Sequence, residues 1–228
     1  MSYEEIYKSK LMTADEAVAA HIKSGDKIWL GGLSVADKVL SCVIEKVKQG
    51  ALENIDFYGN MTMDDIGLAD KDIPADKFRY HAFFYGGYER EGCKNGVVTN
   101  VPLHLSRFED YVSYIDPDVA VVPMTPPNEQ GFCNIGPAGY SPSGLNHAKK
   151  IIAQINKNIP RVYGSSHDYH VNDIAAFVEC HKDELMPSSQ PPTATEEKIA
   201  SYILERIPDG ACIQLGIGGT ANAVGFGL

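Results

Sequence analysis

The chain has 228 residues, of which 44% are hydrophobic and 22% charged, and its formal net charge is −10. This composition is typical of a globular protein with a substantial core. An acidic chain with an isoelectric point near 5.1 is poorly suited to nucleic acid or an anionic membrane surface, so neither partner is expected. No apolar stretch is long enough to cross a membrane, and MSYEEIYKSK lacks the apolar core of a signal peptide.

The five cysteines are odd in number, lie far apart and form no CxxC pair. Four of them have apolar neighbours, which is typical of reduced residues in a core. We therefore expect a cytoplasmic protein without a disulfide framework.

The predicted elements alternate between helices and strands along the chain. Helices are indicated by apolar residues at helical spacing and by capping boxes, in which a Ser or Thr and a Glu bind each other's backbone amides. The predicted helices are 13–23 capped by Thr13, 34–49 capped by Ser34, a segment opened by a Ser106–Glu109 capping box, 143–149 and 196–207. The predicted strands are 27–30, 55–58, 80–85, 96–101, 118–123, 151–155, 175–178 and a terminal strand from Cys212. This alternation predicts an α/β fold with a largely parallel sheet and helices on both faces.

A change of composition predicts a domain boundary. Residues 187–193 are rich in proline and serine, which favours a linker. The linker separates an N-terminal domain at 1–186 from a second segment at 194–228, which holds a helix, a strand and a glycine loop.

The second segment repeats the beginning of the chain. GDKIWLG at 25–31 and GACIQLG at 210–216 share both terminal glycines, Ile and Leu at one constant offset. The preceding helices keep this register, with Ile203 in the place of Val18. A second domain of similar fold is therefore predicted to begin near residue 194, with only its first helix and strand present.

The glycine loop after the terminal strand is the main candidate site. Gly216, Gly218 and Gly219 leave backbone amides open beside a helix N-terminus, where a phosphate or the oxyanion of a thioester under attack can bind. GIGGTA also fits the loose dinucleotide-binding pattern GxGxxA. A tight strand-to-helix turn without a ligand explains the same glycines, so the loop alone leaves all three interpretations open.

Other motifs do not indicate a metal or a nucleotide. His167, His170, Cys180 and His181 are close in sequence, but their spacing matches no established zinc site, so no metal is expected. The aromatic stretch 80–85 alternates as a core strand does. The sequence has neither a GxSxG nucleophile elbow nor a P-loop.

Four ordered motifs resemble the acetyl-CoA hydrolase and 4-hydroxybutyrate CoA-transferase family, a family I type of CoA-transferase. They are DPDVAVV at 116–122 with PPNEQGFCNIG at 126–136, AKKIIAQIN at 148–156 with IPRVYG at 159–164, HVNDI at 170–174 with FVE at 177–179, and DGACIQLGIGGTANAV at 209–224. PLHLS at 102–106 fits as well, so the resemblance runs through the whole chain. Family members have about twice this length and two tandem α/β domains, which implies that the chain corresponds to their N-terminal half.

The sequence departs from the family pattern at two places. Ala221 stands where the glycine motif usually has proline, and residues 33–36 lack the EPP-like stretch common near the first glycine loop. The first departure is modest, because proline there would only preset a helix start. The second leaves the identity of the acyl group open.

The resemblance implies transfer of CoA between an acyl-CoA thioester and a short-chain carboxylic acid of the 4-hydroxybutyrate, butyrate or acetate type. A glutamate carboxylate attacks the thioester, and an acyl-glutamyl anhydride and a glutamyl-CoA thioester follow. Family members carry this glutamate in an LGIH(T/S)EM-like stretch shortly after the glycine motif, and no such stretch occurs up to Leu228. We therefore expect no catalytic residue in this chain and no activity from it alone.

The resemblance also assigns substrate contacts. Oxyanion or CoA contacts are expected from Gln214, Gly216, Ile217, Gly218, Gly219 and Thr220. An acyl pocket is expected from Asn60, Met61, Gln130 and Asn134. The pocket residues follow strands at the carboxyl edge of the sheet, where open α/β sheets bind ligands, although ordinary polar loop residues would look the same. Coenzyme A is expected as a substrate, with no permanently bound cofactor.

Several alternatives stay open. In the acetyl-CoA hydrolases of the same family, water replaces the acceptor acid. A non-catalytic acyl-CoA-binding module and a dinucleotide-binding domain are alternatives from other classes. The expected partners are an acyl-CoA, a small carboxylic acid, the remaining C-terminal domain and further copies of the chain in a homo-oligomer.

Overall fold

The computed structural model describes residues 1–139, 141–184 and 191–228. The chain divides into two compact units, 1–185 and 186–228, and each is described by itself. The linker predicted at 187–193 lies mostly outside the described residues.

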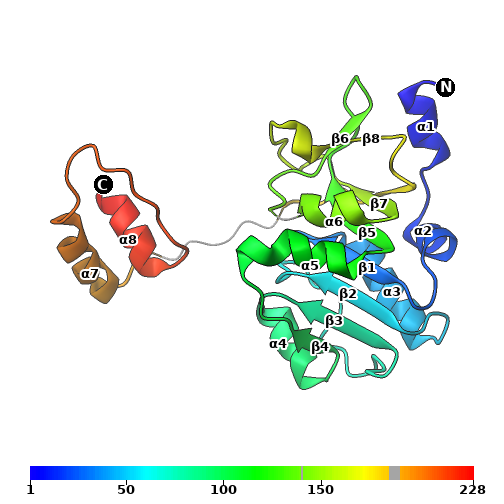
Figure 1. Cartoon of the computed structure of the whole chain (residues 1–228), viewed down its shortest axis with the longest axis horizontal. Helices are drawn as coiled ribbons and strands as arrows, with labels where there is room; N and C mark the ends of the chain where they lie inside the picture. The colour runs from blue at the N-terminus through cyan, green and yellow to red at the C-terminus, as the bar shows by residue number, and fades with distance from the viewer. Residues whose placement is uncertain (140, 185–190) are drawn as a thin grey trace. The chain divides into compact units, whose positions relative to one another are not determined.

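The first unit contains a parallel sheet with helices packed against it (Figure 1). Its helices are α1 (Tyr3–Ser9), α2 (Ala14–His21), α3 (Asp37–Lys48), α4 (Gly87–Lys94), α5 (Phe108–Ile115) and α6 (Ser141–His147), with 3-10 turns η1 (Leu105–Arg107) and η2 (Ser165–His167). Its strands are β1 (Lys27–Gly31), β2 (Ile55–Gly59), β3 (Phe78–Ala82), β4 (Val98–Asn100), β5 (Val119–Met124), β6 (Phe132–Asn134), β7 (Lys150–Ile155), β8 (Asp168–His170) and β9 (Ala176–Glu179). The predicted α/β class with a largely parallel sheet is confirmed.

Seven strands form the main sheet in the order β4-β3-β2-β1-β5-β7-β9, and neighbouring strands run parallel. β6 and β8 form a separate antiparallel pair. The strand order reverses at β1, because β2 to β4 lie on one side of it and β5, β7 and β9 on the other. An open α/β sheet binds its ligands beyond the carboxyl ends of the strands at such a reversal.

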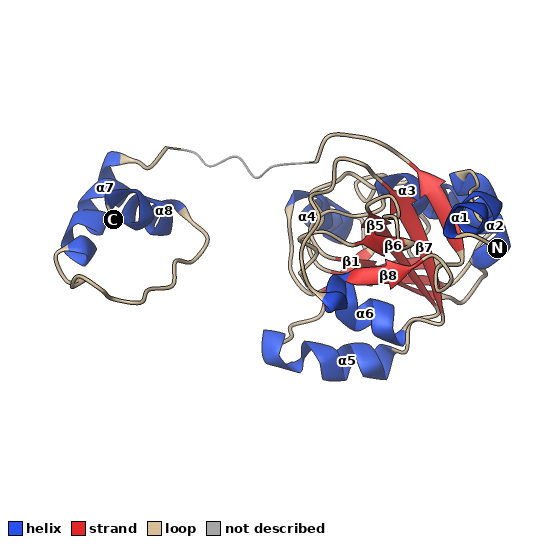
Figure 2. Ribbon diagram, turned by 90° about the horizontal axis from the view of Figure 1, so that it is seen from above, coloured by secondary structure: helices blue, strands red, loops and turns tan. Residues whose placement is uncertain are grey.

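The strands alternate their side chains between two cores, one on each face of the sheet. In β1, Ile28 and Leu30 belong to one core and Trp29 to the other, and all three are fully buried. Helices α3 and α4 lie on one face, and α5 and α6 on the opposite face (Figure 2). Burial on both faces explains why β5 and β7 read as continuous apolar runs.

The predicted cap of the second helix is wrong. Ser34 does not cap α3, which begins at Asp37 without a side-chain cap. A distant residue binds the free amides instead, since Gln154 Oε1 accepts from the N–H groups of Lys38 and Val39 at 3.0 and 3.3 Å. A tertiary contact therefore replaces the local cap.

The predicted Ser106–Glu109 capping box is also wrong. α5 follows η1, and its N-cap residue, Arg107, makes no side-chain capping bond. Glu109 pairs with His147 of α6 at 3.0 Å, so its carboxylate binds the neighbouring helix.

Several boundaries shift, and some short elements escape prediction. The strand predicted at 80–85 is β3, which begins and ends earlier, and the helices predicted at 143–149 and 196–207 each begin two residues earlier. α1, α4, β6 and β8 were not predicted. β6 and β8 have three residues each, too few to show a period.

The second unit contains α7 (Ala194–Leu204) and α8 (Gly219–Gly227), which pack around Ala200, Ala223 and Val224. α7 begins with a capping box between Thr193 and Glu196. The terminal strand predicted from Cys212 is not formed, because residues 211–216 pair with no strand among the described residues. A strand needs a neighbour to satisfy its backbone groups, and the described part of this unit provides none.

Candidate functional site

Atoms of Ala138 and Ser141 occupy the space beside the glycine loop after β1. Gly31 has a φ of +83°, and a Cβ on Gly32 would lie 2.7 Å from the carbonyl oxygen of Ala138. Ser141 Oγ accepts the Gly32 N–H at 3.1 Å and donates to Ala138 O at 2.9 Å. These glycines therefore allow close packing of the loop against the start of α6.

In the glycine loop of the second unit, by contrast, Gly216 and Gly218 are not packed against other residues. A Cβ on Gly216 or Gly218 would meet no atom within 4 Å, and Gly218 has a φ of +151°. Gly219 is the first residue of α8. The first amides of a helix have no acceptor within it, and they carry a partial positive charge. The loop therefore offers hydrogen-bond donors in open space.

A carboxylate lies beside this loop. Glu196 closes the capping box of α7 with Thr193, and its carboxylate occupies the place that a Cβ on Gly219 would take. Hydrogen bonds from the Thr193 backbone and side chain lower the pKa of Glu196. A negative charge is thus fixed next to the N-terminus of α8, and only glycine at 219 lets the two elements approach.

All six residues predicted to contact the oxyanion or CoA, from Gln214 to Thr220, line an open hollow of ≈ 800 Å³. Its other walls are Glu196, Ile203, Ile207, Ile213, Leu215, Ala221 and Val224. Ile213 and Leu215 are 41% and 45% exposed there. These two side chains alternate with Gln214 along an extended segment that pairs with no strand among the described residues.

The segment after β2 contains buried polar atoms without partners. Asn60, predicted for the acyl pocket, is buried, and its Oδ1 has no hydrogen-bond partner among the described residues. The same holds for Oγ1 of Thr62, which the sequence analysis did not single out. Met61, between them, is half-buried. Buried polar atoms are nearly always paired, so this segment is the best candidate in the first unit for a polar ligand contact.

The start of this segment is held by two buried side chains. Glu89 accepts from the N–H groups of Thr62 and Gly86 at 2.7 and 2.8 Å. The Tyr80 hydroxyl donates to the carbonyl oxygen of Asn60. Burial, and then the charge of Glu89, raise the pKa of Tyr80 well above its usual value, so the hydroxyl stays a donor.

The end of the segment is tied to the loop after β1. The Met63 N–H donates to the carbonyl oxygen of Leu33 at 2.9 Å. Asp64 Oδ2 accepts from the Val35 N–H at 3.0 Å. The loops that follow β1 and β2 therefore hold each other in place.

Lys182 supplies the positive charge in this region. Its Nζ donates to Asp64 Oδ1 and lies 2.8 Å from Asp37 Oδ1. Gln154 Nε2 donates to the same Asp37 oxygen at 2.8 Å. Burial lowers the pKa of Lys182, but the hydrogen bonds to the two carboxylates outweigh it and raise the pKa. The ammonium group is therefore charged at neutral pH.

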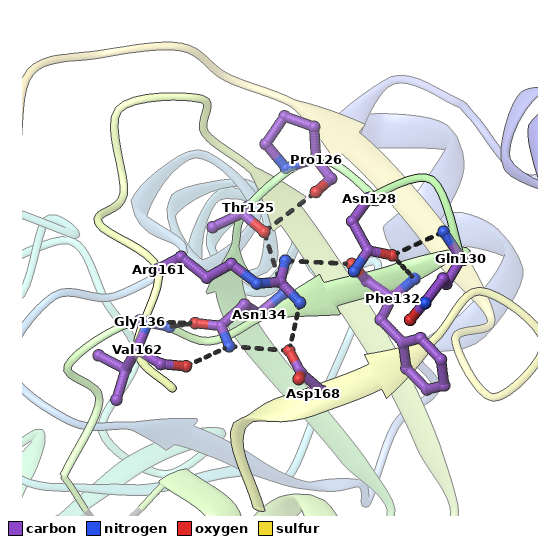
Figure 3. Close-up of polar contacts among 10 residues, drawn as sticks. All are labelled: Thr125, Pro126, Asn128, Gln130, Phe132, Asn134, Gly136, Arg161, Val162 and Asp168. Carbon is purple, nitrogen blue, oxygen red and sulfur yellow. Dashed lines mark hydrogen bonds and ion pairs between the residues drawn. The ribbon is translucent and has the colours of Figure 1, made fainter. Parts of the chain in front are cut away.

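The other two predicted pocket residues have different surroundings (Figure 3). Gln130 is exposed in the turn before β6. Asn134 is fully buried, and its Nδ2 donates to Val162 O and Asp168 Oδ1 at 2.9 and 2.8 Å. Its Oδ1 accepts from the N–H groups of Gly136 and Val162 at 2.9 and 3.0 Å. Asn134 thus uses its full hydrogen-bonding capacity, and it supports the surrounding loops.

The predicted pocket residues come from two segments, one directly after β2 and one around β6. No hydrogen bond among the described residues joins Asn60 or Met61 to Gln130 or Asn134. The polar residues that the sequence analysis missed are Thr62, Asp64, Glu89, Gln154 and Lys182. Of these, only Gln154 could have been singled out from the sequence, because it is a polar residue within an otherwise apolar strand.

The described parts of the chain contain neither a metal-binding cluster nor a membrane-spanning helix. There, no group of three or more His, Cys, Asp or Glu side chains is placed to hold a metal ion. No helix of these parts is long and apolar enough for a membrane span.

Known proteins resemble the chain in sequence. Residues 1–188 match the protein-family model described as acetyl-CoA hydrolase/transferase N-terminal domain. Butyryl-CoA:acetate CoA-transferase of Anaerostipes caccae is 36% identical across 99% of this chain and 51% of that protein. 4-hydroxybutyrate coenzyme A transferase of Clostridium kluyveri is 32% identical across 98% of this chain and 52% of that protein. The chain spans about half the length of the curated relatives it matches.

Solved structures share the fold. RipA from Yersinia pestis has a TM-score of 0.89 at 23% identity, over 98% of this chain and 54% of that one. 4-hydroxybutyrate CoA-transferase from Porphyromonas gingivalis has a TM-score of 0.73 at 23% identity, over 98% of this chain and 52% of that one. At these identities the likeness supports the fold alone. The family match over residues 1–188 shows that the chain belongs to the acetyl-CoA hydrolase/transferase family.

Proposed function

We propose that the protein transfers CoA between an acyl-CoA thioester and a short-chain carboxylic acid such as acetate, butyrate or 4-hydroxybutyrate. The observation that carries the proposal is the glycine loop at the N-terminus of α8, where Gly216 and Gly218 have open space around them and the Glu196 carboxylate lies against Gly219. Relatives that are 36% and 32% identical are a butyryl-CoA:acetate and a 4-hydroxybutyrate CoA-transferase. The proposed activity is therefore that of the whole protein to which this chain contributes.

The second unit is proposed to stabilise the tetrahedral oxyanion of the reaction. The N–H groups of Gly216, Gly218 and Gly219 are its proposed donors, and loss of one such donor costs about 3–4 kcal/mol of transition-state stabilisation. Ile217 and the side chains of Gln214 and Thr220 are proposed CoA contacts. A preorganised loop suits this role because its amides need no rearrangement when charge develops.

The first unit is proposed to bind the acyl group. Asn60 and Met61 lie at the carboxyl end of β2, where Asn60 Oδ1 and Thr62 Oγ1 have no partner among the described residues. Asn60 Oδ1 can accept a hydrogen bond from the hydroxyl group of a 4-hydroxybutyryl chain, and Thr62 Oγ1 can donate to it or accept from it. Gln130 and Asn134 are proposed as more distant parts of the pocket, with Asn134 in a supporting role.

The proposed nucleophile is a glutamate outside this sequence. It attacks the thioester carbonyl to give an acyl-glutamyl anhydride and CoA thiolate, and the thiolate then forms a glutamyl-CoA thioester with release of the acid. The 228 residues lack the family's glutamate motif. We therefore propose that this chain alone transfers no CoA and that activity requires the C-terminal domain.

The test compares the 228-residue chain with the product of the complete gene. We expect the complete product to convert butyryl-CoA and acetate into acetyl-CoA and butyrate, and the chain alone to be inactive. Mass spectrometry of the complete product after incubation with acyl-CoA should show a CoA adduct on one glutamate. Transfer by the chain alone, or no transfer by the complete product with any of the three acids, would overturn the proposal.

Thioester hydrolysis is a second candidate function, favoured by the description of the matched family as acetyl-CoA hydrolase/transferase. The same assay distinguishes it, because a hydrolase releases free CoA at a rate that does not depend on acetate. A transferase releases little free CoA without an acceptor acid.

A further inference from the structure

We propose that Lys182 is a positioning residue, which holds the loops after β1 and β2 in register and thereby sets the position of the acyl-binding segment 60–62. This inference rests on the proposed function, since that function makes Asn60 and Met61 acyl contacts. It adds a residue that is distant in sequence from both loops and whose side chain binds Asp64 and Asp37, neither of which is a proposed substrate contact.

The first support is the position of Lys182 relative to the sheet. Lys182 follows β9, and β7, β5 and β1 lie between β9 and β2 in the strand order. Its side chain nevertheless reaches Asp64 in the loop after β2 and Asp37 at the start of α3. Lys182 thus links the segment after β9 to the segments after β1 and β2, although β9 neighbours neither of these strands.

The second support is that the backbone of Lys182 is fixed. Asn156, which is 1% exposed, accepts the Lys182 N–H at 3.3 Å and donates to its carbonyl oxygen at 2.9 Å. Asn156 Nδ2 also donates to Glu184 Oε1 at 2.7 Å. Hydrogen bonds to both the backbone N–H and the carbonyl oxygen of Lys182 hold its backbone in place. The side chain of a positioning residue needs such a fixed starting point.

The third support is the charge balance. The side chain of Asp64 is only 6% exposed, so water screens its charge poorly. Without Lys182, the carboxylate of Asp64 would still accept the hydrogen bond from the Val35 N–H. It would, however, face the negative charge of Asp37 with no cation between them. A buried carboxylate that loses its cation is strongly destabilised, whereas Asp37 keeps Gln154 and the N-terminus of α3. The strain therefore falls on the loop that carries Asn60 and Met61.

The chain offers a matched control. Lys48 also bridges two carboxylates, Glu45 and Asp70, each at 2.7 Å, and its side chain is 21% exposed compared with 26% for Lys182. It lies in the last turn of α3, at the other end of that helix from the candidate pocket. Lys48→Met removes a bridge of the same kind, but to carboxylates that are 54% and 36% exposed, and it leaves Asp64 and segment 60–62 untouched. Asp70 lies farther along the connection between β2 and β3.

The kinetic test uses the product of the complete gene. We expect Lys182→Met to raise the KM for acyl-CoA about tenfold while kcat changes by less than about threefold, because the acyl contact moves and the chemistry does not. Lys182→Arg should restore most of the affinity, and Lys48→Met should leave KM unchanged.

Two further measurements keep the inference testable if Lys182→Met folds poorly. The double variant Asp64→Asn/Lys182→Met removes both charges and should recover the KM of the unchanged protein to within about threefold. In the 228-residue chain, hydrogen exchange of the Val35 and Met63 amides should speed up in Lys182→Met and not in Lys48→Met. Equal KM shifts in the two single variants, or no change of exchange at these amides, would overturn the inference.

The outcomes separate the two proposals. If the complete product transfers no CoA, the proposed function fails, and the exchange experiment still decides whether Lys182 holds the two loops. If transfer is observed and Lys182→Met behaves like Lys48→Met, only the role of Lys182 fails.

Discussion

Two buried asparagines differ in what their side chains bind. Asn134 makes four hydrogen bonds with its side chain, whereas Asn60 Oδ1 makes none among the described residues. A buried amide without a partner costs free energy unless a ligand or a water binds it. The same residue type is thus a support at one position and a candidate contact at the other, and the sequence alone treats both alike.

Asp118 shows how the surroundings of a single carboxyl group change its pKa. Its Oδ2 accepts from the Lys27 N–H at 3.0 Å, and its Oδ1 binds Lys149 Nζ at 2.9 Å. Burial raises the pKa of Asp118, but these bonds together outweigh burial and lower it. In the unfolded chain the pKa of an aspartate is about 3.9. Because the pKa of Asp118 is lower in the folded state, its ionised carboxylate stabilises the fold at pH values above about 3.9. This contribution is lost as the pH falls through the folded pKa.

We expect Asp118→Asn to lower the free energy of unfolding by about 1 kcal/mol at pH 7, since a charged acceptor becomes neutral. The difference between the variant and the unchanged protein should shrink as the pH falls below about 4. Urea unfolding followed by circular dichroism at several pH values measures this. A difference that stays constant from pH 7 to pH 2.5 would contradict it.

At the scale of elements, helix starts depend on which partner reaches the free amides. The capping box predicted at Thr13 is formed by local side chains. An unpredicted box between Thr193 and Glu196 at the start of α7 is formed in the same way. At α3 the distant Gln154 replaces Ser34, and at α5 Glu109 binds His147 of α6. A box is thus predictable where the helix start faces solvent, and it fails where another element supplies a better partner.

Close packing of α6 on the sheet gives a prediction for one helix. Gly144 lies so close to the indole ring of Trp29 that a Cβ there would overlap it. We expect Gly144→Ala to lower the free energy of unfolding by about 1–3 kcal/mol through overpacking, although alanine favours helices. Gly87→Ala is the control, because a Cβ at the start of α4 would meet no atom within 4 Å. Denaturant unfolding of both variants measures the effect, and equal stability of the two would refute the packing argument.

At the scale of the whole molecule, the two copies of the internal repeat differ in burial. Ile28 and Leu30 of β1 are 0% exposed, whereas Ile213 and Leu215 at the same repeat positions are 41% and 45% exposed. β1 lies between β2 and β5, and the described part of the second unit provides no such neighbours. The same local pattern is therefore a central strand in one unit and an unpaired segment in the other.

We expect this difference to appear in backbone protection. In the 228-residue chain, amides of residues 211–217 should exchange with solvent near the rate of an unprotected peptide. Amides of residues 27–31 should be protected by a large factor, because they open only with the sheet. Hydrogen exchange followed by mass spectrometry compares the two segments in one sample, and similar protection would show that residues 211–217 have found a strand partner.

The sequence by itself determined the α/β class, most strands of the parallel sheet, the capping box at Thr13 and the family motifs. These features are local, because periodicity, capping and motif spacing depend on residues a few positions apart. Only the tertiary structure decided that Ser141 fills the first glycine loop, that Asn134 is saturated, and that Lys182 reaches Asp64. Each of these contacts joins residues far apart in the chain, and strand order, which no local pattern specifies, brings them together.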